Sequence, residues 1–221
     1  MPDLTLRGGA GARVDTEIEI KRSRFLCRLV RVEDEVAARA VIEDARREQW
    51  NARHHCSAFV VGSASAPDQL RRSNDDGEPS GTAGRPMLEA LSGRHFIDCV
   101  AVVSRYFGGV LLGAGGLVRA YSDSVLAAID DAHAQGAVVA RERRMLHTLS
   151  LAHADAGRVE SELRQRGVTV LGTEYRDRAI VRLSGGDPVL LSALVAEATS
   201  GGGALEAAGY EWIDVELSAE R

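Results

Sequence analysis

The sequence predicts an α+β protein built from two domains. Its 221 residues are enough for one large domain or two small ones. Hydrophobic residues make up 45% and charged residues 27%, a balance typical of globular proteins and unlike disordered or collagen-like chains. The pattern of strand-like and helix-like segments starts afresh after Gly136, and no apolar run approaches the ~18 residues of a membrane span. We therefore expect one domain over residues 1–137 and another over residues 138–221.

The first expected elements are two short strands and a helix. After a frayed start, residues 17–22 and 23–32 have strand-like composition. Residues 34–48 carry apolar side chains at helical spacing, and Asp34 stands where a helix cap belongs. A short β-rich run follows at residues 56–61. These segments give the first half of the domain a mixed α and β character.

The second half of this domain begins with a polar, turn-rich segment over residues 70–81, which predicts a loop. A helix is expected over residues 82–91, and Pro86 is tolerated there only if it lies in the first turn. Residues 97–103 are unbroken apolar, as expected of a central strand buried on both faces. A long helix with one apolar stripe should follow the glycine-rich turn and end near Ala134.

The second domain shows a repeat of strand and helix signals. Asp155 and Asp187 are expected to cap its two helices, the second with Pro188 at its first position. In order, the expected elements are a strand at 145–151, a helix at 155–166, strands at 168–175 and 178–183, a helix at 188–199 and a strand at 210–217. This βαββαβ order over ~75 residues predicts a ferredoxin-like domain.

Charge and cysteine content limit the function classes. The chain has 27 basic and 32 acidic residues, which divide as 17 against 19 up to residue 137 and 10 against 13 after it. By bulk charge, neither half is a basic nucleic-acid module. The three cysteines form no CxxC pair, which favours neither a disulfide framework nor a zinc ribbon. Free thiols and the lack of a signal-peptide pattern predict a cytoplasmic protein. No cofactor is expected.

Glycine is concentrated in one region: nine of the 23 glycines lie between Gly77 and Gly116. This cluster fits no named phosphate or hydrolase motif. Ala114 stands where a Walker A loop needs lysine, and Val118 stands where a dinucleotide-binding fingerprint needs its third glycine. Ser80 does not lie in a GxSxG nucleophile elbow.

A more general anion site remains open. Gly113–Gly116 precede the long helix, whose N-terminus presents unpaired N–H groups, and Arg105 and Arg119 flank the loop. The alternative is a tight turn that needs glycine for packing alone. The candidate anion- or nucleic-acid-binding residues are Arg85, Arg105, Gly113, Gly115, Gly116 and Arg119.

An acidic loop and a His-His-Cys run are the other candidates. Carboxylates this close together suit a hard cation or a general base, and a solvated turn is the alternative. His54 and His55 are adjacent on an extended segment and point to opposite faces, so no metal site is expected there. The possible functional loop consists of Asp75, Asp76, Glu78, Ser80 and Thr82.

Three segments taken together resemble the YigZ/IMPACT family. They are ARHHC at residues 52–56, DDGEPSGTAGRP at residues 75–86, and SRYFGG continuing through LGAGGLVRAY at residues 104–121. The resemblance covers about residues 17–133 as an Impact-type N-terminal domain. Residues 142–217 are similar to the smaller C-terminal domain of bacterial members.

The resemblance implies a domain of the ribosomal-protein-S5 domain-2-like kind followed by a ferredoxin-like domain. That order is similar to the last two domains of elongation factor G, and eukaryotic relatives act in translational control. We therefore expect a non-enzymatic protein that binds RNA, the ribosome or a translation regulator protein, and no membrane. The alternative is an enzyme that acts on a phosphorylated or acidic small molecule, in a pocket between residues 75–82 and 113–116.

Overall fold

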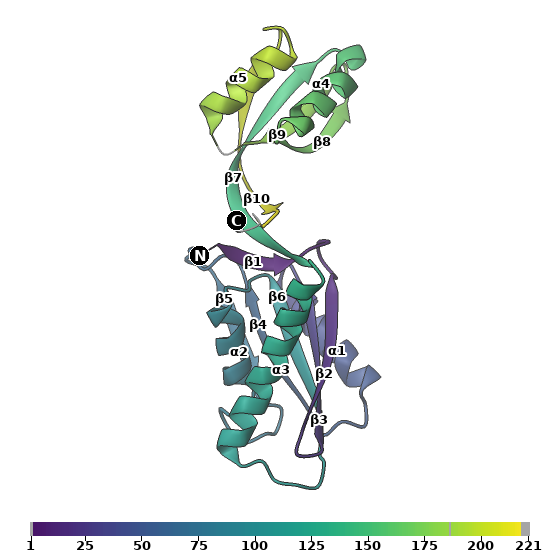
Figure 1. Cartoon of the computed structure of the whole chain (residues 1–221), viewed down its shortest axis with the longest axis vertical. Helices are drawn as coiled ribbons and strands as arrows, with labels where there is room; N and C mark the ends of the chain where they lie inside the picture. Colours follow the sequence, from purple (N-terminus) through teal and green to yellow (C-terminus); the bar gives the residue numbers. More distant parts are fainter. Residues whose placement is uncertain (1, 186, 218–221) are drawn as a thin grey trace. The chain divides into compact units, whose positions relative to one another are not determined.

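The computed structural model describes residues 2–185 and 187–217, and its contacts divide the chain into two units. Unit 1 contains the described residues up to Arg141 and those from Asp214 onward, and unit 2 is Glu142–Ile213. Both units combine strands and helices, which confirms the predicted α+β class with two domains (Figure 1). In the described residues no helix is both long and apolar enough to cross a membrane.

Unit 1 is built on an antiparallel sheet. The strand β6 (Cys99–Tyr106) lies at its centre and is buried along almost its whole length, as its unbroken apolar run predicts. From one edge to the other, the strands are β2 (Arg13–Ile20), β3 (Ser23–Arg31), β6, β4 (His54–Val61) and β5 (Leu70–Asn74).

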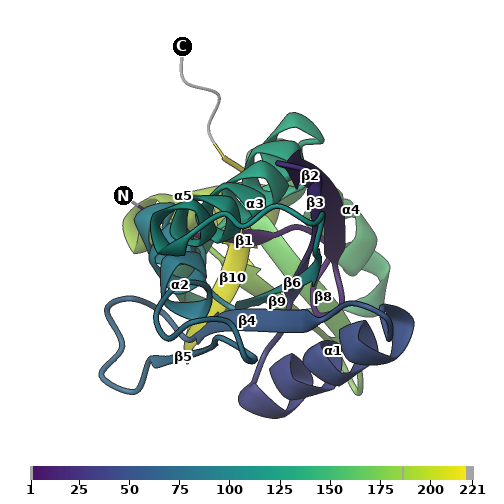
Figure 2. The same cartoon turned by 90° about the horizontal axis from the view of Figure 1, so that it is seen from below.

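Helices cover both faces of this sheet. Figure 2 shows α1 (Glu35–Glu48) on the side opposite α2 (Gly84–Gly93) and α3 (Ala114–Ala134). The predicted cap of α1 is confirmed, because Asp34 accepts a hydrogen bond from the backbone N–H of Ala37 at 2.7 Å. The predicted apolar stripe of α3 is also confirmed and is buried against the sheet: Leu117, Tyr121, Val125, Ala128, Ile129 and Ala132.

Two predictions for unit 1 are wrong. Residues 70–74 were expected in a loop, but they form the edge strand β5, whose side chains are mostly exposed. This strand is formed by backbone hydrogen bonds to β4 at the edge of the sheet. Its exposed side chains need no alternation of apolar and polar residues, so no strand signal is present in the sequence. The start of the chain was expected to fray, but β1 (Asp3–Leu6) pairs with Val138–Arg141. That partner lies far along the chain, where a local pattern cannot indicate it.

Unit 2 has the predicted βαββαβ order. The strand β7 (Val138–Leu151) begins in unit 1, and in unit 2 it pairs with both β9 and β10, while β8 pairs with β9. The elements after β7 are α4 (His153–Gln165), β8 (Thr169–Tyr175), β9 (Ala179–Ser184), α5 (Pro188–Ala198) and β10 (Leu205–Val215).

The two helices of unit 2 start differently. Asp187 caps α5 as predicted, because its carboxylate accepts a hydrogen bond from the N–H of Val189 at 2.8 Å. Asp155 was expected to cap α4, and this is wrong. The helix begins earlier, after Ala152, so Asp155 lies within its first turn. An acidic residue also suits the first turn of a helix, so composition cannot separate the two positions.

One carboxylate shapes the loop between β5 and α2. Asp75 accepts hydrogen bonds from the backbone N–H groups of Gly81 at 2.7 Å, Gly84 at 2.8 Å and Ala83 at 3.1 Å. Asp75 therefore caps α2 from a distance, because Ala83 at the cap position has no suitable side chain. Burial alone would raise the pKa of Asp75, but these three donors hold it below its ordinary value.

The turn after β6 packs closely against the turn before β3. A Cβ atom on Gly108 would lie 2.0 Å from the carbonyl carbon of Arg22 and 2.4 Å from the nitrogen of Ser23. The backbone N–H of Gly108 also donates to the Ser23 hydroxyl at 3.1 Å. Only glycine fits at this point, because the obstructing atoms belong to the backbone.

We predict that Gly108→Ala destabilises the protein by about 1–3 kcal/mol, because the new methyl group forces two backbone segments apart. Gly93→Ala is the matched control, since a Cβ atom there meets nothing within 4 Å. The free energy of unfolding, measured with urea and circular dichroism, should fall for the first variant only. Equal stability of the two variants would contradict this packing argument.

We also predict that Asp75→Ala lowers the free energy of unfolding by about 1–3 kcal/mol at pH 7, because three backbone donors lose their acceptor. The folded-state pKa of Asp75 lies below its ordinary value. The stabilisation that Asp75 contributes is therefore fully present above pH ~4, and it is lost as the pH falls through the pKa that Asp75 has in the folded protein. The difference from the parent protein should shrink in acid. Asp68→Ala, at an exposed loop position, should show neither effect.

Candidate functional site

A cavity of about 360 Å³ lies in unit 1 beside the end of β6 and the start of α3. Both segments singled out in the sequence contribute to it, since Glu78 comes from the acidic loop and Gly113 from the glycine-rich loop. The residues that line it are Arg53, His54, Glu78, Pro79, Arg105, Phe107, Leu111, Leu112, Gly113, Ala114 and Leu117.

A buried ion pair forms the inner wall of this cavity. Arg105, near the end of β6, donates from Nη1 to Oε1 of Glu78 at 2.5 Å, and both side chains are buried. The hydroxyl of Tyr121 on α3 donates to the same oxygen at 2.8 Å. Burial, together with the nearby Cys56 and Glu78, raises the pKa of Tyr121 well above its ordinary value. Tyr121 therefore remains a neutral donor, and the carboxylate is held by two partners.

One edge of the Arg105 guanidinium is left without a hydrogen bond. Glu78 occupies Nη1, whereas Nε is buried and has no partner among the described residues. Arg105 is only 6% exposed, and its guanidinium lies 5.4 Å from the ring centre of Phe25 and 5.7 Å from that of Phe107. A buried N–H group without an acceptor is costly, so this edge is suited to an oxygen-bearing ligand.

The start of α3 adds further unpaired donors. Gly113 occupies the cap position at φ 71°, a conformation that favours glycine, and no side chain caps the helix. The described hydrogen bonds include no acceptor for the N–H groups of Ala114, Gly115 and Gly116. The first turn also has no acidic residue. The N-terminus of α3 therefore keeps its partial positive charge available.

Arg53 and Phe107 form the mouth of the cavity, and neither was among the predicted site residues. The Arg53 guanidinium lies 6.0 Å from the ring centre of Phe107, and no ion pair to a described carboxylate is found for it. Phe107 is 43% exposed. Both residues lie inside the segments that carry the family resemblance. Their sequence signal is an arginine directly before a buried strand and an aromatic residue directly after one.

Several predicted anion-binding residues lie away from the cavity wall. Arg85 is exposed on α2 and pairs with Glu89 at 2.9 Å. Arg119 is exposed on α3 and does not line the cavity. Gly115 and Gly116 belong to the first turn of α3, where they offer N–H groups but no wall.

Most of the acidic loop is used to hold its own shape. Asp76 accepts from Arg46 at 2.9 Å and from the backbone N–H of His55 at 2.6 Å. Thr82 donates to the carbonyl of Pro79 at 2.6 Å, and Ser80 is exposed. With Asp75 capping α2, Glu78 is the one predicted loop residue on the cavity wall.

The His-His-Cys run is divided between the two faces of the sheet, as strand alternation predicts. His54 lines the cavity, and its Nδ1 lies 2.8 Å from the carbonyl oxygen of Asp76. A carbonyl only accepts, so Nδ1 donates in this contact, and Nε2 is the ring nitrogen with no described partner. Burial raises the pKa of the Cys56 thiol to about 12. Among residues 2–185 and 187–217, no group of three or more His, Cys, Asp or Glu side chains is arranged to hold a metal ion.

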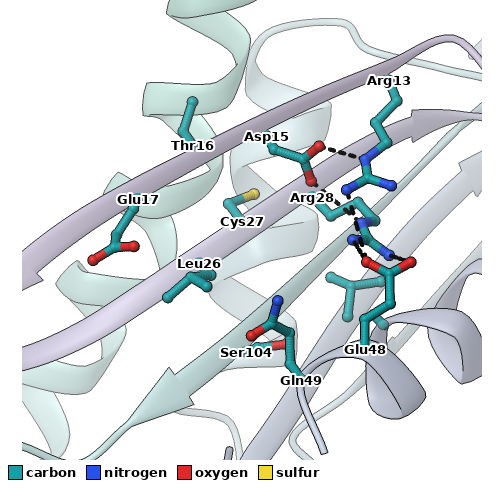
Figure 3. A pocket seen from close by; sticks show the side chains of 12 residues that line it. Arg13, Asp15, Thr16, Glu17, Leu26, Cys27, Arg28, Glu48, Gln49 and Ser104 are labelled. Atoms are coloured by element: carbon teal, nitrogen blue, oxygen red, sulfur yellow. Dashed lines mark hydrogen bonds and ion pairs between the residues drawn. The ribbon is translucent and has the colours of Figure 1, made fainter.

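A second cavity, of about 260 Å³, lies against β2, β3 and the end of α1. Figure 3 shows Arg13 and Arg28 directed toward Asp15 and Glu48. Arg28 reaches Asp15 at 3.2 Å and Glu48 at 2.5 Å, and Arg13 also pairs with Asp15. The hydrogen bond from Arg28 lowers the pKa of Glu48. The charges here neutralise one another, so the first cavity is the better candidate for binding an anion.

Comparisons with known proteins place the chain in a family. Residues 21–129 match the Impact N-terminal domain, and residues 149–184 match a domain of unknown function (DUF1949). A crystal structure described as that of a hypothetical protein is 35% identical, with a TM-score of 0.57, and covers 94% of this chain and 98% of its own.

Two curated relatives carry the family name. IMPACT family member YvyE of Bacillus subtilis is 48% identical over 149 residues, which cover 67% of this chain and 65% of that protein, just under two thirds of its length. IMPACT family member YigZ of Escherichia coli is 39% identical over 166 residues, which cover 75% of this chain and 79% of that protein. The resemblance seen in the sequence is therefore confirmed, and the chain belongs to the IMPACT family.

Proposed function

We propose that this protein is a non-enzymatic regulator of translation that binds RNA, free or on the ribosome, through the cavity surface of unit 1. The observation that carries the proposal is a concentration of N–H donors that have no acceptor among the described residues. These donors are Arg53, the free edge of Arg105 and the uncapped N-terminus of α3. Membership of the IMPACT family supports the link to translation, because eukaryotic relatives act in translational control.

The net negative charge of the chain means that RNA can be bound only at a local group of positive donors. With a formal net charge of −5, the chain does not attract a polyanion through its general field. Binding to RNA must therefore come from local contacts to phosphate groups. The second cavity is a poorer place for such contacts, because Arg28 is already paired there with Asp15 and Glu48. Phosphate contacts also make the affinity depend on salt, because each contact releases condensed counterions.

The proposal predicts salt-dependent binding of the full chain to single-stranded RNA and to ribosomes. About three phosphate contacts give a slope near −2 in a plot of log affinity against log salt. Arg53→Gln should weaken binding and make that slope shallower by about 0.7, the share of one contact. Fluorescence anisotropy with labelled RNA and co-sedimentation with ribosomes measure both effects.

The control is Arg47→Gln, which removes an exposed arginine from α1. It should leave both the affinity and the slope unchanged. If the parent protein binds neither RNA nor ribosomes at ~50 mM salt, where phosphate contacts are strongest, the proposed function is wrong. Equal losses in the two variants would mean that binding follows net charge and not this site.

A second candidate function is an enzyme that acts on a phosphorylated or acidic small molecule. It is favoured by two cavity groups that can exchange protons, the Glu78 carboxylate and Nε2 of His54, which lie beside the same anion donors. Oε1 of Glu78 accepts from Arg105 and Tyr121, and no described residue bonds to Oε2.

This second function predicts that a substrate raises the melting temperature in a panel of nucleotides and sugar phosphates, because a ligand that binds the folded state stabilises it. Glu78→Gln removes the carboxylate but keeps an amide oxygen that can accept from Tyr121, so turnover of the ligand should be lost. Because this change also leaves the buried Arg105 without its ion-pair partner, urea unfolding must show that the variant is folded. If no compound in the panel changes the melting temperature of the parent protein, the enzyme hypothesis is abandoned.

A further inference from the structure

We propose that the cavity holds a single nucleotide bearing a terminal phosphomonoester, with the phosphate at the start of α3 and the base against Phe107. The inference rests on the proposed function, because the same donors would serve both. It adds that the site distinguishes a nucleotide with a phosphorylated end from the interior of a strand. The shared chemistry is that of a free nucleoside monophosphate and of a phosphorylated RNA end.

The phosphate end of the cavity is a set of N–H donors for which residues 2–185 and 187–217 provide no acceptor. Ala114 and Gly113 form part of the wall, and the N–H of Ala114 is the first free donor of α3. Arg105 lines the same cavity and is more than nine-tenths buried, and its Nε has no partner in the part of the chain that the structure describes. Nη1 is bonded to Glu78, and among the described residues no hydrogen bond is found for the edge of the guanidinium formed by Nε and Nη2. That edge has the fork geometry that binds two phosphate oxygens.

A terminal phosphate fits these donors better than an internal one. A phosphomonoester carries a charge of about −1.5 to −2 at pH 7 and three acceptor oxygens. An internal phosphodiester carries a single charge and two free oxygens. The titratable groups that face the cavity are Arg53, Arg105, Glu78 and His54. Glu78 is bonded to Arg105 and Tyr121, so its negative charge is compensated and does not repel the anion.

The other end of the cavity is apolar and aromatic. Phe107 is 43% exposed and Leu111 is 83% exposed, so large apolar groups stand open to solvent at the mouth. The exposed guanidinium of Arg53 beside the Phe107 ring provides a second flat surface. Bases stack on aromatic rings and on arginine guanidinium planes. A base placed here would cover the exposed apolar surface while its phosphate reached α3.

The size of the cavity sets the number of nucleotides. At about 360 Å³ it lies near the lower end of the ~300–1,000 Å³ typical of small-molecule sites. This volume suits one nucleotide and not a folded stretch of RNA. The remainder of a bound strand would therefore lie outside the cavity.

The test compares the same hexanucleotide RNA with a 5′-phosphate, with a 3′-phosphate and without a terminal phosphate, together with adenosine monophosphate, adenosine and inorganic phosphate. Calorimetry on the full chain should show binding at least about tenfold tighter for one phosphorylated end than for the unphosphorylated strand, the loss of about one charge-assisted contact. Adenosine monophosphate should bind more tightly than adenosine or phosphate alone.

The outcomes separate this inference from the proposed function. Equal affinity for the three hexanucleotides overturns the inference but leaves RNA binding intact. Binding of adenosine monophosphate without any binding of RNA supports the cavity assignment, identifies a free nucleotide as the source and refutes the RNA function. No binding of any probe refutes both. Phosphate binding as tight as that of the nucleotide also overturns the inference, because the base would then contribute nothing.

Variants of Phe107 and Arg105 test where the base and the phosphate of the ligand bind. Phe107→Leu should weaken the binding of adenosine monophosphate at least about fivefold, which is the lower limit for the loss of one base stack. The binding of inorganic phosphate should be unchanged. Arg105→Lys keeps the charge beside Glu78 but removes the fork, so the preference for a phosphorylated end should disappear. Urea unfolding shows whether each variant is folded. Arg47→Gln is the matched control, and an equal effect there would overturn the assignment.

Discussion

The arrangement of unit 1 depends on the ion pair between Arg105 and Glu78, buried where β6 meets the loop before α2. Placing two charges out of contact with water is costly unless each is paired and hydrogen-bonded. The Tyr121 hydroxyl provides the additional bond to Glu78. A strand, a loop and a helix from distant parts of the sequence are thereby tied together. Removing either charge would leave the other buried alone, so the cavity wall depends on both.

The charged groups around the site are of two kinds: those already bonded within the protein, and those left to bind a ligand. Asp75 and Asp76 accept hydrogen bonds that hold the loop in position, which leaves Glu78 as the acidic side chain on the wall. On the opposite face of the sheet, Arg28 is matched by Asp15 and Glu48. In the cavity, by contrast, the donors of Arg105 and α3 exceed the acceptors. The local excess of positive donors exists despite the net negative charge of the chain.

Sequence patterns were sufficient for elements whose cause is local. Asp34 and Asp187 cap helices because a short side chain meets the next turn, and the apolar stripe of α3 follows directly from helical spacing. The edge strand β5 and the first strand β1 were missed, since both exist through backbone pairing with remote segments. The start of α4 was misplaced because acidic residues suit both a cap and a first turn.

The sequence by itself determined the fold class, the family and the two segments from which the cavity is built. Only the tertiary structure decided which of their residues face it. Arg105 and Gly113 lie on the cavity wall, whereas Arg85 and Arg119 do not, and Arg53 and Phe107 were added. The physical reason is that a residue's type and spacing specify what it can bind. Its access to a ligand depends on which acceptors and donors the folded chain has already brought to it.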